Sequence, residues 1–256
     1  MLGAITGDII GSVYEHYPIK TKDFELYAPH CRFTDDTALT VAVADALLKD
    51  RNYSRSLERF YYHYPRVPYG ARFHDWASSH DQLPYNSWGN GSAMRVSPVA
   101  YCFDSLEEVL EEAKQSAEVT HNHPEGIKGA QAVAAAILWA RKGRDKNFIK
   151  EEVCRRFDYD LSRSLDVIRP VYTCDLSCQH TVPEAIICFL ESDSFEDCIR
   201  NAVSLGGDAD TMACIAGSIA EAFYGIPDYF IEKSMSYLDE RIIYILQKFS
   251  ESYGSG

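Results

Sequence analysis

The spacing of hydrophobic residues along the 256-residue chain follows helical rather than strand periodicity. Runs that stay apolar on nearly every helical face, as at 38–44 and 212–224, are typical of buried helices. No segment shows the alternation of a half-buried strand beyond a few residues, and no linker divides the chain. The sequence therefore predicts an all-α fold, with a single compact multi-helix domain over residues 1–253.

The boundaries of the helices follow from capping residues, prolines and glycines. The expected helices cover residues 35–49, 54–63, 105–118, 125–142, 181–191, 194–205, 212–224 and 229–250, with short surface helices between 146 and 168. Pro183 is expected in the first turn of its helix, where proline is tolerated. Residues 16–33 and 64–90 contain prolines and no clean period, so we expect loops there. We expect Gly254-Ser255-Gly256 to fray.

Three glycines lie on one face of a first expected helix, because Gly3, Gly7 and Gly11 are spaced four residues apart. Glycine weakens a helix, so such a stripe indicates that another backbone packs closely against it. Asp8 and Glu15 are seven residues apart and are expected to project from similar faces of that helix. An acidic pair on a packed face is less expected than the glycines alone, so the segment is a candidate for function as well as packing.

The charge of the chain excludes several classes of function. A net charge of −13 with no offsetting basic stretch argues against binding to nucleic acid or to anionic membranes. The sequence shows no signal peptide and no apolar run long enough to span a bilayer. We therefore expect a cytoplasmic protein without nucleic-acid or membrane partners, and we expect it to be a monomer.

The eight cysteines suit a reducing compartment. Cys188 and Cys214 lie in apolar helical patterns, where a thiol behaves as a small hydrophobe. The one metal-like cluster is Cys174-x3-Cys178-x-His180, and no second pair at finger spacing accompanies it. Reduced thiols are the simpler interpretation, with a zinc site as the alternative.

Two short segments combine carboxylates with threonine hydroxyls at helix starts. Residues 34–37, Thr-Asp-Asp-Thr, precede one apolar run, and residues 206–211, Gly-Gly-Asp-Ala-Asp-Thr, precede another. The first segment alone is explained as an N-cap with acids in the first turn. Two such segments at buried helices are harder to explain, because burying several acids is costly unless cations are present. The hypothesis is a binuclear hard-metal site whose ligands are Thr34, Asp35, Asp36, Asp208, Asp210 and Thr211.

Residues 86–95, Asn-Ser-Trp-Gly-Asn-Gly-Ser-Ala-Met-Arg, form a glycine-rich segment. Its glycines let main-chain N–H groups approach a ligand's phosphates at a following helix start, although Asn-Gly is also a common turn. His121 stands at the junction before the helix expected at 125–142. A capping or core histidine is the ordinary interpretation of that position.

Together these motifs resemble the ADP-ribosylglycohydrolase family, over most of the chain and in the family's order. The matching segments are Gly3-x3-Gly7-Asp8-x2-Gly11 with the Ser-Val-Tyr-Glu that ends at Glu15, Phe33 to Thr37, Gly89 to Arg95, Thr120 to Gly126, and Gly206 to Thr211. Ala209 replaces a frequent threonine of the family, and residues 64–88 match it loosely. Because that region shapes the pocket in the family, substrate identity stays open.

The resemblance implies an all-α fold that holds two Mg²⁺ or Mn²⁺ ions facing the terminal ribose of a bound ADP-ribose. The implied metal ligands are again Thr34, Asp35, Asp36, Asp208, Asp210 and Thr211, and Glu15 is the implied catalytic acid or base. The implied substrate-binding residues are Gly70, Ser87, Trp88, Gly89, Asn90, Gly91, Ser92 and His121.

The activity implied by the resemblance is hydrolysis of a glycosidic bond. ADP-ribose would be removed from a modified protein side chain or a related small conjugate by binuclear-metal-assisted cleavage at the anomeric carbon. Arginine, serine and other linkages, and O-acetyl-ADP-ribose, stay open as the bond cleaved. Two alternatives remain, a two-metal phosphoesterase acting on a nucleotide diphosphate and a non-catalytic ADP-ribose-binding protein. The intact Glu15 and both complete acidic motifs favour an active hydrolase.

Overall fold

The computed structural model describes residues 1–254, so the fraying expected for Ser255 and Gly256 lies outside the described residues. Within 1–254 the secondary structure is helical, apart from one isolated bridge between Gly89 and Ser177, which confirms the all-α prediction. The helices of this range are α1 (Leu2–Gly11), α2 (Asp35–Leu47), α3 (Tyr53–His63), α4 (Ala71–Ser78), α5 (Gly91–Met94), α6 (Val99–Cys102), α7 (Leu106–Glu118), α8 (Pro124–Arg141), α9 (Lys146–Phe157), α10 (Leu165–Ile168), α11 (Cys178–Leu190), α12 (Phe195–Val203), α13 (Ala209–Tyr224), α14 (Asp228–Met235) and α15 (Glu240–Tyr253). None of these helices is long and apolar enough to cross a lipid bilayer.

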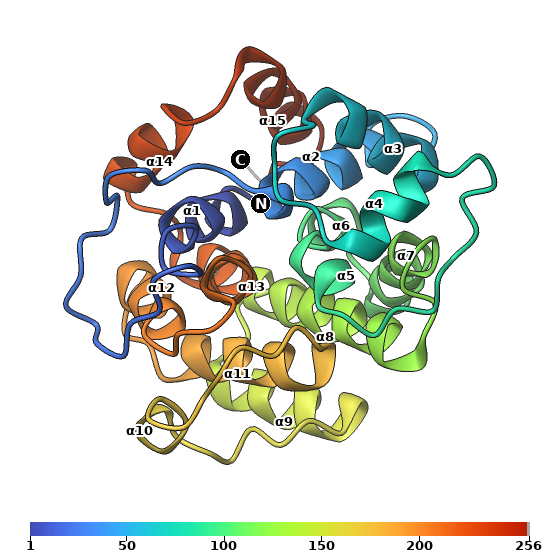
Figure 1. Ribbon diagram of the computed structural model, residues 1–256. Helices are drawn as coiled ribbons and strands as arrows, with labels where there is room; N and C mark the ends of the chain where they lie inside the picture. The colour runs from blue at the N-terminus through green and yellow to red at the C-terminus, as the bar shows by residue number, and fades with distance from the viewer. Residues whose placement is uncertain (255–256) are drawn as a thin grey trace.

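Helix α13 lies at the centre of the molecule. Every residue from Ala209 to Ala220 is buried, and α13 contacts α1, α8, α11 and α12. A helix that is apolar on most faces needs neighbours on all sides. Figure 1 shows these neighbours arranged around α13, with α1 directly beside it although the two are far apart in the sequence.

The glycine stripe of α1 makes the α1–α13 contact possible. A methyl group on Gly7 would collide with the carbonyl oxygen of Ala213. Gly3 and Gly11 face the α13 backbone in the same way, at Gly217 and at Ala209. The close backbone approach expected from the sequence is therefore confirmed, and it brings Asp8 of α1 close to Asp210 at the start of α13.

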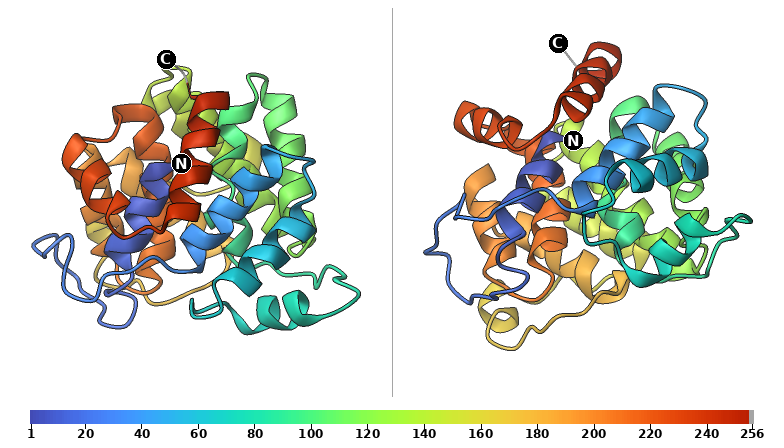
Figure 2. Two further views of the ribbon diagram at one scale, coloured as in Figure 1. Left: turned by 90° about the horizontal axis from the view of Figure 1, so that it is seen from above. Right: turned by 45° about the horizontal axis from the view of Figure 1, so that its top comes forward.

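Two expectations for the C-terminal and N-terminal helices are wrong. The helix expected over 229–250 is two helices, because α14 ends at Met235 and Asp239 caps α15 by accepting a hydrogen bond from the backbone N–H of Ile242 at 2.9 Å. Figure 2 shows α14 and α15 in red as separate helices, which pack on α1 and α2 respectively. At the other end, α1 stops at Gly11, so Glu15 lies in the following turn and not on the helix that carries Asp8.

Two further expectations need correction between α3 and α11. Helix α4 lies inside the segment 64–90 that was expected to be irregular, because Phe73 and Trp76, three residues apart, are both buried and anchor one face. Helix α11 begins at Cys178, so Pro183 lies in the second turn rather than the first. Proline there leaves one carbonyl of the first turn without its usual backbone donor.

Candidate functional site

A cavity with a volume of about 570 Å³ gathers most of the residues predicted from the sequence. The predicted residues that line it are Glu15, Asp35, Asp36, Gly70, Ser87, Trp88, Gly89, Asn90, Gly91, His121, Asp208, Asp210 and Thr211. Thr34 and Ser92 are buried behind this lining. The fold therefore brings the two acidic motifs and the glycine-rich segment to one space.

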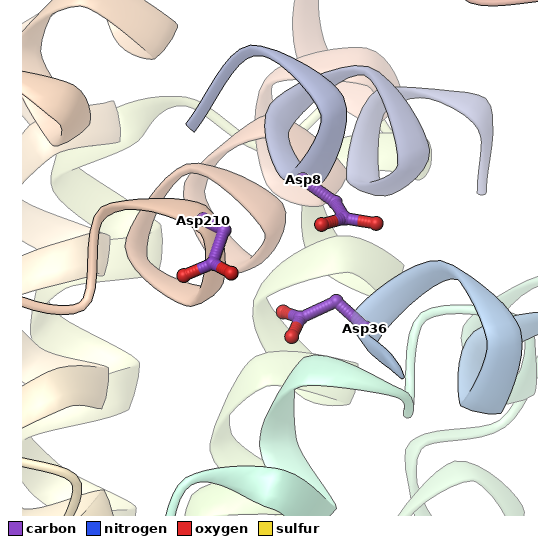
Figure 3. A group of neighbouring side chains, drawn as sticks. All are labelled: Asp8, Asp36 and Asp210. Carbon is purple, nitrogen blue, oxygen red and sulfur yellow. The ribbon is translucent and has the colours of Figure 1, made fainter. Parts of the chain in front are cut away.

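Three carboxylates from three helices converge at one end of the cavity. Asp8 of α1, Asp36 of α2 and Asp210 of α13 each offer an oxygen, and these oxygens lie within 4.8 Å of one another. Figure 3 shows the three side chains pointing toward one another. A second group, in which Glu15 and Asp208 join Asp210, meets the same criterion. Because Asp210 belongs to both groups, the arrangement suits two neighbouring cations that share a carboxylate.

Asp8 was not among the predicted ligands, yet it organises the start of α2. Its carboxylate accepts hydrogen bonds from the backbone N–H groups of Thr34 at 2.9 Å and Thr37 at 3.1 Å. It also accepts from the Thr34 hydroxyl at 2.7 Å and from the Thr37 hydroxyl. A side chain of α1 thus satisfies donors that a helix start leaves free. The sequence hint was an acid beside the glycine stripe; its partners depend on the tertiary fold.

Residues 34–37 have the geometry of an N-cap, as the sequence indicated. The Thr34 hydroxyl accepts a hydrogen bond from the Asp36 N–H at 3.2 Å, as an N-cap does. The cap aims Asp36 at the second motif, where the Thr211 hydroxyl donates to the Asp36 carboxylate at 3.3 Å. Capping and metal binding are therefore compatible at this helix start.

The electrostatics of the cluster fit cations. Burial raises the pKa of Asp8 to about 6, and burial together with the nearby Asp8 raises the pKa of Asp35 to about 8. Burial followed by neighbouring carboxylates also raises the pKa of Asp36 and of Asp210 well above the usual range. One oxygen of Asp36, Oδ1, is buried without a hydrogen-bond partner in the part of the chain described. Divalent cations would remove the repulsion and use that free oxygen, and hard oxygen donors are the set that Mg²⁺ or Mn²⁺ prefers.

The glycine-rich segment also lines the cavity and is held in place by backbone hydrogen bonds. The Asn90 N–H donates to the Leu176 carbonyl at 2.8 Å, and the Cys178 N–H donates to the Trp88 carbonyl at 2.9 Å. The Asn90 side chain is already engaged, since its amide donates to Asp208 at 2.5 Å and to the Thr181 hydroxyl at 3.1 Å. Asn90 therefore ties the glycine-rich segment to the second acidic motif.

The other predicted residues of this side differ in how they reach the cavity. Trp88 is 48% exposed and packs against His123, and the space beside Gly70 is open, with no atom within 4 Å of where a methyl group would stand. Ser87 accepts a hydrogen bond from the Gly89 N–H at 3.1 Å. The Ser92 hydroxyl donates a hydrogen bond to the Gly126 carbonyl at 2.7 Å, and Ser92 does not line the cavity.

His121 is buried and lies against the glycine-rich segment. Its Nδ1 lies 2.8 Å from the Thr120 hydroxyl. Burial, and then the guanidinium groups of Arg95 and Arg72, hold the pKa of His121 well below its ordinary value, so the ring is neutral. The capping histidine of this junction is His123, which accepts from the N–H of Glu125 at 3.1 Å.

The zinc alternative gains no geometric support among the described residues. Cys174 is exposed, whereas Cys178 is buried with its thiol 3.1 Å from the Gly89 carbonyl. His180 pairs with Asp175 through Nδ1 at 3.1 Å. The groups that could hold a metal within 1–254 consist of carboxylates.

Comparisons with known proteins identify the family of the chain. The sequence model described as ADP-ribosylglycohydrolase matches residues 1–248, which confirms the resemblance. The chain is 26% identical to human ADP-ribosylhydrolase ARH3, over 88% of this chain and 84% of that protein. It is 27% identical to ADP-ribosylarginine hydrolase Tri1 of Pseudomonas putida (strain GB-1), over 91% and 72%. A solved structure titled ADP-ribosylglycohydrolase-related protein complex has the same fold, with a TM-score of 0.75, 24% identity, and 98% and 97% of the two chains covered.

Proposed function

Because the chain belongs to the ADP-ribosylglycohydrolase family, we propose that it hydrolyses ADP-ribose conjugates and releases ADP-ribose from a modified protein side chain or a small conjugate. The observation that carries the proposal is one cavity lined by carboxylates of both groups and by the glycine-rich segment. Relatives named as an ADP-ribosylhydrolase and an ADP-ribosylarginine hydrolase support the same activity.

The proposed cofactor is a pair of Mg²⁺ or Mn²⁺ ions held by Thr34, Asp35, Asp36, Asp208, Asp210 and Thr211. When bound, such ions supply Lewis acidity to the oxygens of the sugar and of water. The protein's own part is to hold the carboxylates in place, through Asp8 on one side and Asn90 on the other. Asp8 is itself close enough to Asp36 and Asp210 to share a cation with them.

Glu15 is the proposed acid or base. Its carboxylate lines the cavity and lies within 4.8 Å of oxygens of Asp208 and Asp210, yet its side chain keeps 35% of its exposed area. A carboxyl group in that place can take a proton from water or give one to the leaving group at the anomeric carbon. The less exposed aspartates around it are better placed to bind than to exchange protons.

Replacement of Glu15 by glutamine tests this role. We expect Glu15→Gln to lower turnover by about a hundred- to ten-thousand-fold, the usual contribution of a general acid or base. The affinity for ADP-ribose, measured by calorimetry, should stay within about twofold, because the amide keeps the size of the carboxyl group. The matched control is Glu25→Gln, an exposed glutamate of the loop that follows Glu15. Turnover retained by Glu15→Gln would refute the assignment.

The products and the linkage decide the remaining choices. Release of ADP-ribose supports the hydrolase, whereas AMP with ribose phosphate indicates the phosphoesterase, and binding without any product indicates a non-catalytic protein. A magnesium-dependent release assay over arginine-linked, serine-linked and O-acetyl-ADP-ribose substrates identifies the bond cleaved.

A further inference from the structure

Arg95 is a fully buried guanidinium at the back of the cavity, in the segment whose glycines line it. Its Nη2 donates to the Ser116 carbonyl at 2.9 Å and to the Thr120 hydroxyl at 2.8 Å. Its Nε and Nη1 have no hydrogen-bond partner in the described chain. Burial lowers the pKa of Arg95 to about 10, which leaves it charged at neutral pH. Burying a charge without an ionic partner is costly, so the position of Arg95 calls for an explanation. The contact to examine is its one hydrogen bond to a side chain, at Thr120.

The Thr120 hydroxyl transmits this contact to His121. Arginine can only donate, so the Thr120 oxygen accepts and keeps its own hydrogen for another acceptor. One candidate is the Ala117 carbonyl, at 3.4 Å, which already accepts the backbone N–H groups of Thr120 at 3.1 Å and His121 at 2.8 Å. The other is Nδ1 of His121, at 2.8 Å. The shorter distance and the free lone pair favour Nδ1.

A neutral imidazole whose Nδ1 accepts a hydrogen bond carries its proton on Nε2. Nε2 of His121 has no hydrogen-bond partner among residues 1–254, and it faces the glycine-rich segment. A methyl group on Gly91 would stand 3.1 Å from Nε2, and one on Gly89 would stand 3.7 Å away. The absence of these side chains leaves Nε2 beside the cavity that His121 lines.

We propose that Arg95 and Thr120 are positioning residues that hold His121 in the Nε2–H tautomer, so that Nε2–H donates to an oxygen of the bound ADP-ribose conjugate. The inference rests on the proposed function, because it takes such a conjugate to occupy the cavity. The charged and titratable groups that face His121 are Arg95, Arg72 and Tyr85. None of them is a carboxylate, so nothing beside the ring favours a second proton on Nδ1.

The tautomer is measured directly by nitrogen-15 NMR of the imidazole rings in the intact protein without ligand. The chain has eight histidines, so the His121 signals are identified by their loss in His121→Gln. We expect wild-type His121 to be neutral with its proton on Nε2. Thr120→Val removes the hydroxyl at nearly constant volume and should shift the proton toward Nδ1, while Thr120→Ser should restore the wild-type signals.

Binding of free ADP-ribose provides the second readout. Thr120→Val should raise the dissociation constant about tenfold, which corresponds to the loss of roughly one hydrogen bond. Thr120→Ser should recover most of the lost affinity. Thr6→Val is the matched control, because Thr6 is also buried and its hydroxyl bonds Ser234 at 2.8 Å away from the cavity. It should lose stability without changing the His121 signals.

A wild-type His121 protonated on Nδ1, or a Thr120→Val protein that keeps both the Nε2–H tautomer and its affinity, overturns the inference. Thr120→Val and Thr120→Ser carry the test, because a substitution of the fully buried Arg95 could prevent folding. The expected tautomers and affinities with no ADP-ribose released from any conjugate would support the inference while ending the proposed function.

Discussion

The two sides of the cavity differ in charge and in how they are held together. The acidic wall is formed by Asp35, Asp36, Asp208 and Asp210, with Asp8 buried behind it. Burial, and then the neighbouring carboxylates, raise the pKa values of Asp36 and Asp210. The loop wall is formed by residues 87–91 with the neutral imidazole of His121, and the buried guanidinium of Arg95 supports it through Thr120. A cavity polarised in this way suits a ligand whose hydroxyl-bearing end meets cations and whose negatively charged end meets hydrogen-bond donors.

The largest effect should come from the residue shared by both carboxylate groups on the acidic wall. Asp210→Asn keeps the size of the side chain but removes the charge on which both proposed cations depend. We expect turnover to fall by more than about a hundredfold, since even residues behind a metal ligand cost up to that much. Magnesium titration by calorimetry should show fewer than two ions bound. The control is Asp166→Asn, whose side chain is 96% exposed; unchanged ion binding in Asp210→Asn would break the assignment.

A somewhat smaller effect should follow from removing the charge of Asp8, whose hydrogen bonds hold the start of α2. In Asp8→Asn the amide NH₂ would face N–H and hydroxyl donors that now point at a carboxylate. We expect a loss of about 1–3 kcal/mol in the free energy of unfolding, measured by urea denaturation, and a drop in activity of roughly tenfold or more. Thr37→Ser, which keeps the hydroxyl donor, should come close to wild type. A fully stable Asp8→Asn protein would contradict this account of α2.

The third prediction concerns thermal stability, which magnesium should raise in the wild-type protein and which Asp36→Asn should raise in the absence of metal. Magnesium at a hundred times its dissociation constant should stabilise the wild-type protein by about 2.7 kcal/mol. Without metal, Asp36→Asn should melt a few degrees higher than wild type, because it removes one of the crowded charges, at about 2–4 °C per kcal/mol for a chain of this size. The variant should respond less to magnesium. Calorimetric melting curves with magnesium and with a chelator measure both, and a wild-type curve indifferent to magnesium would count against the metal site.

The smallest effect concerns Gly70, an open position in the lining of the cavity. Gly70→Ala meets no atom within 4 Å, so its free energy of unfolding should change by no more than about 0.5 kcal/mol. The added methyl group takes space in the cavity, so the affinity for ADP-ribose should fall a few-fold. An unchanged affinity would remove Gly70 from the proposed substrate-binding residues.

Much of the acidic wall could be predicted from local pattern. The threonine and aspartates at the start of α2 behave as a cap, and the glycine stripe predicted the contact between α1 and α13. The role of Asp8 could not be predicted, because its four donors come from a different helix start. Glu15 was expected on the same helix as Asp8, because none of the residues between Gly11 and Glu15 is of a type that predicts a helix end.

The loop wall was harder to predict, since its chemistry depends on contacts between distant segments. The glycine-rich segment was recognised, but the bond from Asn90 to Asp208 joins positions more than a hundred residues apart. Arg95 closes that segment in the sequence and yet acts on Thr120, behind the wall. Helix α4 was missed because only Phe73, Trp76 and Ala77 of its eight residues are buried, too few to show a clear helical period.

The hydrogen bond from Asn90 to Asp208 couples ligand binding at the loop wall to cation binding at the acidic wall. A ligand that orders the glycine-rich segment also orders Asp208, and a cation that fixes Asp208 also fixes Asn90. Linkage then requires reciprocity, because the factor by which magnesium tightens ADP-ribose binding must equal the factor by which ADP-ribose tightens magnesium binding. With varying free magnesium, the proposed site would therefore bind ADP-ribose conditionally, most tightly when the proposed cations are bound.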